Sequence, residues 1–210
     1  MEKIDDAMNN FEAVVIANGE YPTRAELLEI IRTAPLVVCC DGAADSLIAN
    51  GGVPDIIIGD LDSLSAQSRT EYRSITIHNP DQQTNDQTKA VEYLLSKGIT
   101  RIAILGATGR REDHTIANIA LTAEYMSRGA EVVSLTDYGC FIPCRDSKTF
   151  HCKAGAQVSI FNINATDLHS EGLDYPIYDF TALWQGTLNC SSTGEFTITA
   201  QGEYIVFISW

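Results

Sequence analysis

Residues 36–42 of the chain read LVVCCDG and residues 54–63 read PDIIIGDLDS, so two short apolar runs each end in acidic residues. A third apolar run, IAIL at residues 102–105, leads into Gly106 and, further on, Asp113. Short apolar runs that alternate with helical patterns are typical of buried parallel strands. Because open α/β sheets bind ligands beyond the carboxyl ends of such strands, we expect these carboxylates at one edge of a sheet.

The same alternation of strand and helix continues on both sides of these runs. Apolar residues at helical spacing and glycine stop signals define the helices. We therefore expect an α/β domain over residues 1–138, with a mostly parallel sheet flanked by helices. Its expected strands are 13–17, 36–40, 55–58, 74–78, 101–105 and 131–136, and its expected helices are 23–32, 44–49, 86–97 and 113–128, with a further helix after Ser63.

After Asp137 the helical periodicity stops. Short β-like segments separated by Gly, Asn, Asp and Ser then recur at spacings of about ten residues, a pattern that favours an antiparallel β-sandwich. We expect residues 139–210 to form this second domain, packed on the first domain or on another subunit. The expected strands are 157–163, 180–184, 186–190, 195–200 and 204–210.

Composition narrows the class of partner. The chain has 210 residues and a formal net charge of −14, which argues against nucleic acid and anionic membranes as partners. No apolar run approaches the ~18–20 residues of a spanning helix. The acidic first ten residues, MEKIDDAMNN, lack an apolar signal core. We expect a soluble, cytoplasmic protein.

The six cysteines are expected to be reduced. Cys39 and Cys40 lie within a predicted buried strand and are interpreted as small core residues. The remaining four form no C-x-x-C pair. The neighbouring His151 and Cys152 leave a zinc site as the alternative.

Asp60 and Asp62 follow a predicted strand directly. In an extended backbone, residues i and i+2 point the same way, so these two carboxylates would face one ligand. Mg²⁺ prefers such hard oxygen ligands. Asp41 and Asp45 at the neighbouring strand end support a cation site, although Asp41 could equally cap a helix. The alternative for Asp60 and Asp62 is a pair of surface turn residues.

Two further polar segments precede predicted helices. DQQTND at residues 81–86 is dense in hydrogen-bonding groups, and its last aspartate falls at a helix N-terminus. GATGRREDH at residues 106–114 places glycines and two arginines where a phosphate could approach. Neither the Walker A pattern nor G-x-G-x-x-G occurs in this segment. The alternative to a phosphate-binding loop is a glycine-rich turn with solvated arginines. Carboxylates, arginines and phosphate-binding loops together are the parts that phosphoryl transfer needs.

These segments, in this order and spacing, resemble the thiamine pyrophosphokinase (thiamin diphosphokinase) family. The matching motifs are DGAAD at 41–45, PDIIIGDLDS at 54–63, DQQTND at 81–86 and GATGRREDH at 106–114, with weaker matches at 172–176 and 186–196. The resemblance implies transfer of pyrophosphate from ATP to the hydroxyethyl group of thiamine, giving thiamine diphosphate and AMP. It also implies Mg²⁺, an ATP- and Mg²⁺-binding domain over 1–138, a thiamine-binding sandwich over 139–210, and a homodimer with sites between subunits.

The resemblance also implies residue roles. It implies that Asp60, Asp62, Asp86 and Asp113 are the catalytic, metal-binding residues. ATP binding would involve Asp41, Gln82, Gly106, Thr108, Arg111 and His114, and thiamine binding would involve Gln82, Tyr175 and Ser192. Three positions depart from the family pattern: Arg110 stands in place of a frequent glycine, Tyr175 in place of a frequent tryptophan, and residues 192–195 in place of a Ser-Asn-Glu-like stretch.

Chemistry leaves some choices open. A primary alcohol is a poor acid, so a carboxylate near the metal would accept its proton, and Asp86 and Asp62 are both hypotheses for that base. One rival function is another Mg²⁺-dependent nucleotide-using transferase or a phosphohydrolase. The other is a thiamine- or nucleotide-binding module without turnover. Release of AMP separates the first rival from the main interpretation.

Overall fold

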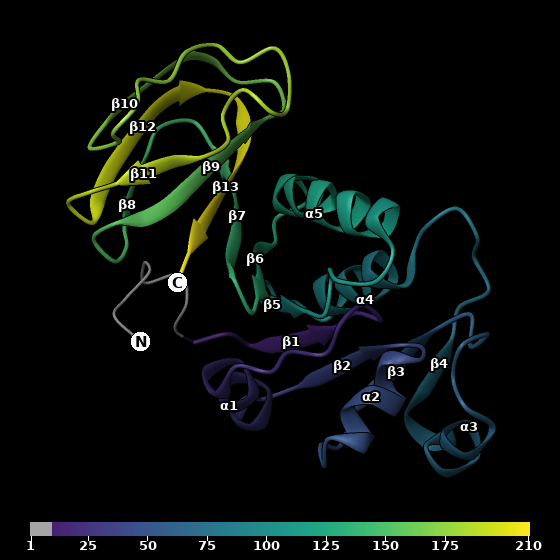
Figure 1. Ribbon diagram of the computed structural model, residues 1–210. Coiled ribbons are helices and arrows are strands. Elements are labelled where there is room, and N and C mark those ends of the chain that lie inside the picture. Colours follow the sequence, from purple (N-terminus) through teal and green to yellow (C-terminus); the bar gives the residue numbers. More distant parts are fainter. Residues whose placement is uncertain (1–9) are drawn as a thin grey trace.

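The computed structural model describes residues 10–210, and strands and helices alternate through its first half (Figure 1). No helix in this part of the chain combines the length and apolar character needed to cross a membrane. The elements are β1 (Ala13–Ile16), α1 (Ala25–Thr33), β2 (Val37–Cys40), α2 (Ala43–Ala49), β3 (Ile56–Gly59), α3 (Ala66–Glu71), a 3₁₀ turn (Arg73–Ile75), β4 (Thr76–His78), α4 (Asp86–Ser96), β5 (Arg101–Leu105), α5 (Glu112–Ser127) and β6 (Glu131–Thr136).

Strands from both halves of the chain join in one large sheet. Within residues 10–210 its order is β11-β9-β13-β7-β6-β5-β1-β2-β3-β4, and the six strands from β6 to β4 are parallel. The chain adds β2, β3 and β4 on one side of β1 and then crosses to add β5 and β6 on the other side. The order therefore reverses between β1 and β5, which is where open α/β sheets form their ligand crevice.

Successive side chains of a strand point to opposite faces of the sheet, and each face packs against a different set of helices. Val14 and Ile16 of β1 belong to the buried cluster that contains residues of α1 and α2. Ala13 and Val15 belong to a second cluster, with residues of α4 and with Tyr125 of α5. Figure 1 shows α4 and α5 on one face of the parallel strands and α1 and α2 on the other. Because both faces are covered, these strands are apolar throughout.

The second half of the chain is built from antiparallel strands. β7 pairs with both β6 and β13, so the large sheet continues without a break into this half, and a separate small sheet has the order β10-β12-β8. Side chains of both sheets, such as Val206 and Phe196, share one buried cluster between them. The elements are β7 (Gly139–Arg145), β8 (Lys148–His151), β9 (Ala156–Asn162), β10 (Thr166–Glu171), β11 (Asn189–Ser191), β12 (Glu195–Gln201) and β13 (Glu203–Ser209).

The expected α/β class with a C-terminal antiparallel sheet is confirmed. Of the five strands expected in the second half, three correspond to β9, β12 and β13 and two are wrong. Residues 180–184 contain no strand, and of the segment 186–190 only the last two residues belong to a strand, β11. β7, β8 and β10 were not among the strands expected from the sequence. In β7, Pro143 lies opposite Ile205. Proline has no backbone N–H to donate to the sheet, so its presence argued against a strand at this position.

Candidate active site at the strand ends

Two loops meet at the point where the strand order reverses. The loop after β1 lies against the loop after β5, because the backbone amide of Gly19 donates to the carbonyl of Gly106 at 2.7 Å and Glu20 donates to that of Thr108 at 2.7 Å. A Cβ atom on Gly19 would lie 2.4 Å from the carbonyl oxygen of Gly106, so only glycine permits this approach. Gly106 is therefore buried in the contact between the loops.

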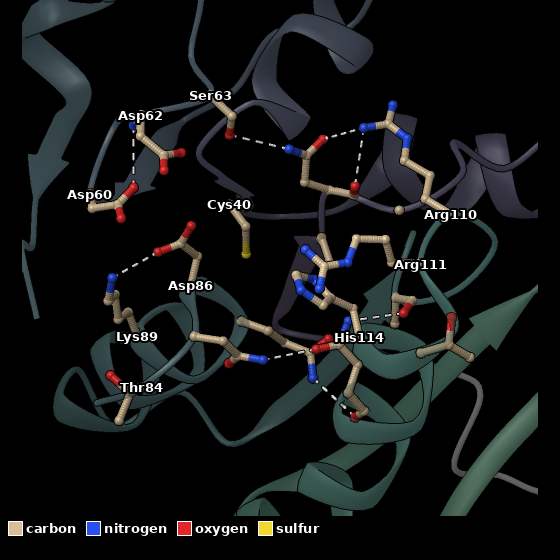
Figure 2. A pocket seen from close by; sticks show the side chains of 18 of the residues that line it. Cys40, Asp60, Asp62, Ser63, Thr84, Asp86, Lys89, Arg110, Arg111 and His114 are labelled. Atoms are coloured by element: carbon tan, nitrogen blue, oxygen red, sulfur yellow. Dashed lines mark hydrogen bonds and ion pairs between the residues drawn. The ribbon is translucent and has the colours of Figure 1, made fainter. Parts of the chain in front are cut away.

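A cavity of about 440 Å³ opens beside this contact. Residues after β1, β3 and β5, the end of β2 and the start of α4 and α5 line it. Figure 2 shows that Asp60, Asp62 and Asp86 lie on one side of the cavity and Arg110, Arg111 and His114 on the other. The cavity thus has an acidic wall and a basic wall, and Cys40 at the end of β2 lies between them.

The acidic wall contains a compact carboxylate cluster. Within the described residues, Asp41, Asp60 and Asp86 form the group whose potential ligand atoms all lie within 4.8 Å of one another, and neither His151 nor Cys152 belongs to it. Asp41 is buried; its Oδ2 accepts bonds from the backbone and hydroxyl of Ser63, whereas its Oδ1 finds no hydrogen-bond partner among the described residues. A buried carboxylate oxygen without a donor indicates room for a cation.

Gly59 makes this convergence possible. It ends β3 between the Asp41 and Asp86 side chains. A Cβ atom at Gly59 would lie 2.9 Å from the Cβ of Asp41 and 3.0 Å from the Cγ of Asp86. Any larger residue would therefore push the two carboxylates apart. The glycine in the GDLDS sequence serves the cluster rather than a turn.

Asp62 is placed differently from the sequence expectation. Leu61 has a φ of 67°, so the chain from Asp60 to Asp62 is not extended. That conformation costs a leucine about 1–3 kcal/mol. Arg69 holds it by donating to the Leu61 carbonyl. Asp60 consequently joins the cluster with Asp41 and Asp86, whereas Asp62 lines the cavity next to it.

Charge in the cluster shifts the acidity of its members. The carboxylate of Asp60 raises the pKa of Asp62, and burial raises the pKa of Asp86 although Lys89 opposes that shift. The amide of Gln82 donates to Oδ2 of Asp60 at 2.9 Å and lowers the pKa of Asp60. Gln82, which was predicted to bind ATP and thiamine, thus contacts a carboxylate of the cluster.

Helix α4 positions Asp86 at its first residue. Asn85 caps the helix, because its side chain accepts a bond from the Thr88 amide at 2.9 Å. The Thr88 hydroxyl lies 2.7 Å from the phenol of Tyr125, so the start of α4 is fixed to α5. A rigid cap keeps the Asp86 carboxylate at the helix N-terminus, where a negative charge is favoured.

The basic wall comes from the loop between β5 and α5. Thr108, Arg110, Arg111 and His114 all line the cavity. Arg110 donates to the Asn18 side chain at 2.9 Å. Arg111 donates to Asp113 at 2.6 Å, and that pair lowers the pKa of Asp113. Asp113 therefore pairs with an exposed arginine and lies outside the carboxylate cluster.

Two of the three residues predicted to bind thiamine, Tyr175 and Ser192, lie near the opposite edge of the large sheet, whereas Gln82 lines the cavity. Asn189 of β11 bonds both the amide and the carbonyl of Tyr175, and Ser192 follows β11 and donates to Asp174. Six strand spacings of about 4.8 Å separate β11 from β1, which is roughly 25–30 Å along the sheet. We call residues 172–188 the aromatic loop; Tyr175, Tyr178 and Trp184 in it are exposed.

Lys89 and Asn18 are cavity residues that the sequence analysis missed. Lys89 lies three residues after Asp86, a spacing that pairs side chains on a helix, so the pattern contained a usable signal. Asn18 lies two residues after the end of β1, next to Gly19, and only the observed contact with Arg110 reveals its position. In the sequence, Asn18 could not be distinguished from any asparagine in a turn.

Two family models match the chain. One describes the catalytic domain of thiamin pyrophosphokinase and matches residues 27–134, just over half of the chain; the other describes the substrate-binding domain and matches residues 139–207. A rice relative, thiamine pyrophosphokinase 1 of Oryza sativa subsp. japonica, is 30% identical over 158 residues, or 63% of this chain. The chain covers 58% of the length of that relative.

Solved structures share the fold. Thiamin pyrophosphokinase from yeast gives a TM-score of 0.78 at 18% identity, over 96% of this chain and 86% of the yeast chain. The enzyme from Bacillus subtilis gives a TM-score of 0.77 at 17% identity, over 94% of this chain and 98% of the other. Sequence models and fold thus agree along both halves of the molecule, and the chain belongs to the thiamin pyrophosphokinase family.

Proposed function

We propose that this protein transfers the pyrophosphoryl group of ATP to the hydroxyethyl oxygen of thiamine and releases AMP and thiamine diphosphate. The observation that carries the proposal is the strand-end cavity, in which a carboxylate cluster faces two arginines across a space of about 440 Å³. A polyphosphate would use both walls, because the arginines on one side and a cation held by the carboxylates on the other would neutralise its negative charge. Membership of the family supports the choice of thiamine as the acceptor.

Mg²⁺ is the proposed cofactor, held by Asp41, Asp60 and Asp86. The unpartnered Oδ1 of Asp41 and the short distances within the cluster fit a hard cation. When bound, the cation supplies positive charge to the phosphate oxygens. Of the residues predicted as ligands, Asp62 is adjacent to this group, whereas Asp113 is held by Arg111. We therefore assign Asp41 a ligand role in place of Asp113.

The basic wall is proposed to bind the phosphates. Arg111 pairs with Asp113 at the surface, and both side chains are largely exposed, so a triphosphate can compete for the guanidinium at little cost. Arg110 is oriented by Asn18 from the neighbouring loop. Thr108 and His114 line the same wall.

Asp62 is the better candidate for the general base. It lines the cavity, and the neighbouring Asp60 charge raises its pKa, which strengthens it as a proton acceptor. Asp86 already uses one oxygen to accept a bond from Lys89. Asp62 therefore accepts the hydroxyethyl proton in our proposal, and Asp86 orients the cation.

We also propose that the active form is a homodimer whose sites lie between subunits. Tyr175 and Ser192 adjoin β11, roughly 25–30 Å along the sheet from β1 and the cavity, so one chain does not bring them together with its own carboxylates. In this arrangement residues 1–138 bind ATP and Mg²⁺, and residues 139–210 of the other subunit bind thiamine. A cytoplasmic location remains a prediction.

Hybrid dimers test the shared site. Chains carrying Asp60→Asn are mixed with chains carrying Tyr175→Ala, and activity is measured at low thiamine concentration. If subunits share sites, a hybrid contains one site with two intact halves, and the mixture is more active than either variant. A mixture that only averages the two variants, although subunit exchange is verified by differently tagged chains, would contradict the arrangement.

The function itself is tested by product analysis. Purified protein is incubated with ATP, Mg²⁺ and thiamine, and we expect AMP and thiamine diphosphate in equal amounts, with no turnover in EDTA. ADP or inorganic phosphate as the product would favour another transferase or a phosphohydrolase. Binding of thiamine or ATP without any product would favour a binding module.

A further inference from the structure

Lys89 is a buried lysine inside the acidic wall. It lies one helical turn after Asp86 on α4, and its side chain is only 2% exposed. Its Nζ donates to Oδ1 of Asp86 at 2.9 Å (Figure 2). Lysine is almost never fully buried unless it is paired, because taking an ammonium group out of water is costly. The position therefore needs a reason beyond packing.

The charge of Lys89 acts on more than its direct partner. Its ammonium group also lowers the pKa of Asp60, after the larger effect of the Gln82 hydrogen bond, and it opposes the effect of burial on Asp86. The two arginines of the cavity are engaged elsewhere, Arg110 with Asn18 and Arg111 with Asp113. Lys89 thus supplies positive charge to the acidic wall from within the chain.

Four carboxylates share this wall, those of Asp41, Asp60, Asp62 and Asp86. Like charges this close destabilise the folded state unless a cation compensates them. The chain folds with one ammonium group in that position, and a divalent cation would bring a second source of charge. These two cations compete, since both are attracted by Asp86 and repel each other.

We propose that Lys89 is a positioning residue that acts as an internal counter-cation: it holds the ionised carboxylates together before a divalent cation binds, and it weakens the binding of that cation. The inference rests on the cation site of the proposed function.

Lys89→Met tests the charge at nearly constant volume. Without divalent cations we expect a lower Tm than in the wild type, and added Mg²⁺ should recover most of the loss. Calorimetric titration of the ATP-free protein should give a Kd for Mg²⁺ that is at least about fivefold lower than in the wild type, because a repelling charge is gone. Lys153→Met, the same change at an exposed residue far along the chain, should alter neither value.

A double variant separates charge from packing and covers the case in which Lys89→Met does not fold. Asp86→Asn with Lys89→Met removes one charge of each sign, so the acidic wall keeps its net charge. We expect the cation-free Tm of this double variant to return to within a few degrees of the wild type. A double variant that stays as unstable as Lys89→Met, or that also fails to fold, would overturn the inference.

The remaining outcomes are distinguishable. If Lys89 only packs, Lys89→Met lowers the Tm equally with and without Mg²⁺, and the Kd stays the same; that result overturns the inference and leaves the cation site intact. A higher Kd overturns it as well. If the wild type shows no Mg²⁺-dependent change of Tm or heat, the cation site of the proposed function is wrong, and the inference falls with it.

Discussion

The strand-end cavity and the aromatic loop are two ways of presenting a functional residue. In the cavity the side chains are fixed by the fold: Asp41 is bonded to Ser63, Asp60 to Gln82 and Asp86 to Lys89. In the aromatic loop the backbone is fixed by Asn189, but the rings face outward, with Trp184 at 73% and Tyr175 at 64% exposure.

This difference indicates which half of the site is complete. One chain supplies every residue that lines the cavity, the charged groups of both walls and the glycines that permit close packing around it. Exposed aromatic side chains in one loop are costly unless something covers them. We therefore expect substitutions in the cavity to act on turnover and cation binding, and substitutions in the aromatic loop to act on thiamine binding.

The largest effect is expected from Asp62→Asn. Loss of the proposed base should lower kcat by at least ~100-fold. The circular dichroism spectrum should stay unchanged, because the side chain is exposed. Glu71→Gln, an exposed acid-to-amide change on α3, is the control and should keep full activity. Near-normal turnover of Asp62→Asn would remove this residue from the chemistry.

Gly59→Ala tests whether the cavity depends on the close approach of two carboxylates. The added methyl group would meet Asp41 at 2.9 Å and Asp86 at 3.0 Å. Overpacking of this kind costs about 1–3 kcal/mol, so the Mg²⁺ concentration for half-maximal activity should rise roughly tenfold. Gly51→Ala adds the same methyl at a positive φ with open space around it. That control should lose stability but keep the wild-type Mg²⁺ requirement.

Tyr175→Ala examines the other side of the comparison. Loss of a stacking ring worth ~1 kcal/mol should raise the KM for thiamine about fivefold and leave kcat unchanged. Tyr178→Ala is a matched control in the same loop, where the ring packs edge-on against Phe180. Equal KM values for the two variants would argue against a specific contact of Tyr175 with thiamine.

The smallest effect concerns the rigid support behind the cavity. Burial raises the pKa of Tyr125 to about 12. An unfolded tyrosine ionises near pH ~10, so between these values the unfolded chain releases a proton that the folded chain keeps, and stability falls as pH rises. Tyr125→Phe should cost about 1 kcal/mol at neutral pH through loss of the Thr88 bond.

Denaturant titrations at several pH values measure the difference in the free energy of unfolding between the wild type and Tyr125→Phe. It should shrink as pH rises from about 10 to 12, since the variant has no phenol to ionise. A difference that stays constant over this range would show that Tyr125 ionises as freely in the folded protein as in the unfolded one.

The sequence predicted the first half of the fold well, for a physical reason. Parallel strands covered on both faces are apolar throughout, and each run such as LVVCC is short and followed by a helical pattern. The second half was harder, because its strands alternate and are interrupted. Pro143 lies inside β7, and the apolar residues of 180–184 lie outside any strand.

In the candidate site, too, the sequence predicted some residue positions and not others. The ends of neighbouring strands indicated that Asp41 and Asp60 would lie at one edge of the sheet. Asp86 begins a helix, and only the family resemblance grouped it with Asp60. Residue types did not reveal that Leu61 adopts a positive φ and that Asp62 lines the cavity beside the cluster of Asp41, Asp60 and Asp86. Nor could they tell us that Asp113 would pair with an arginine two residues before it.

The continuity of the large sheet limits how this molecule can move. A hinge between the two halves would have to break the main-chain ladder between β6 and β7, from Ser134 opposite Phe141 to Thr136 opposite Gly139. The amides of this ladder should therefore be among the slowest to exchange with deuterium, and ligands should not change that rate. Any closure around a substrate must then arise from loop rearrangement or from a change in how the two chains of the proposed dimer dock.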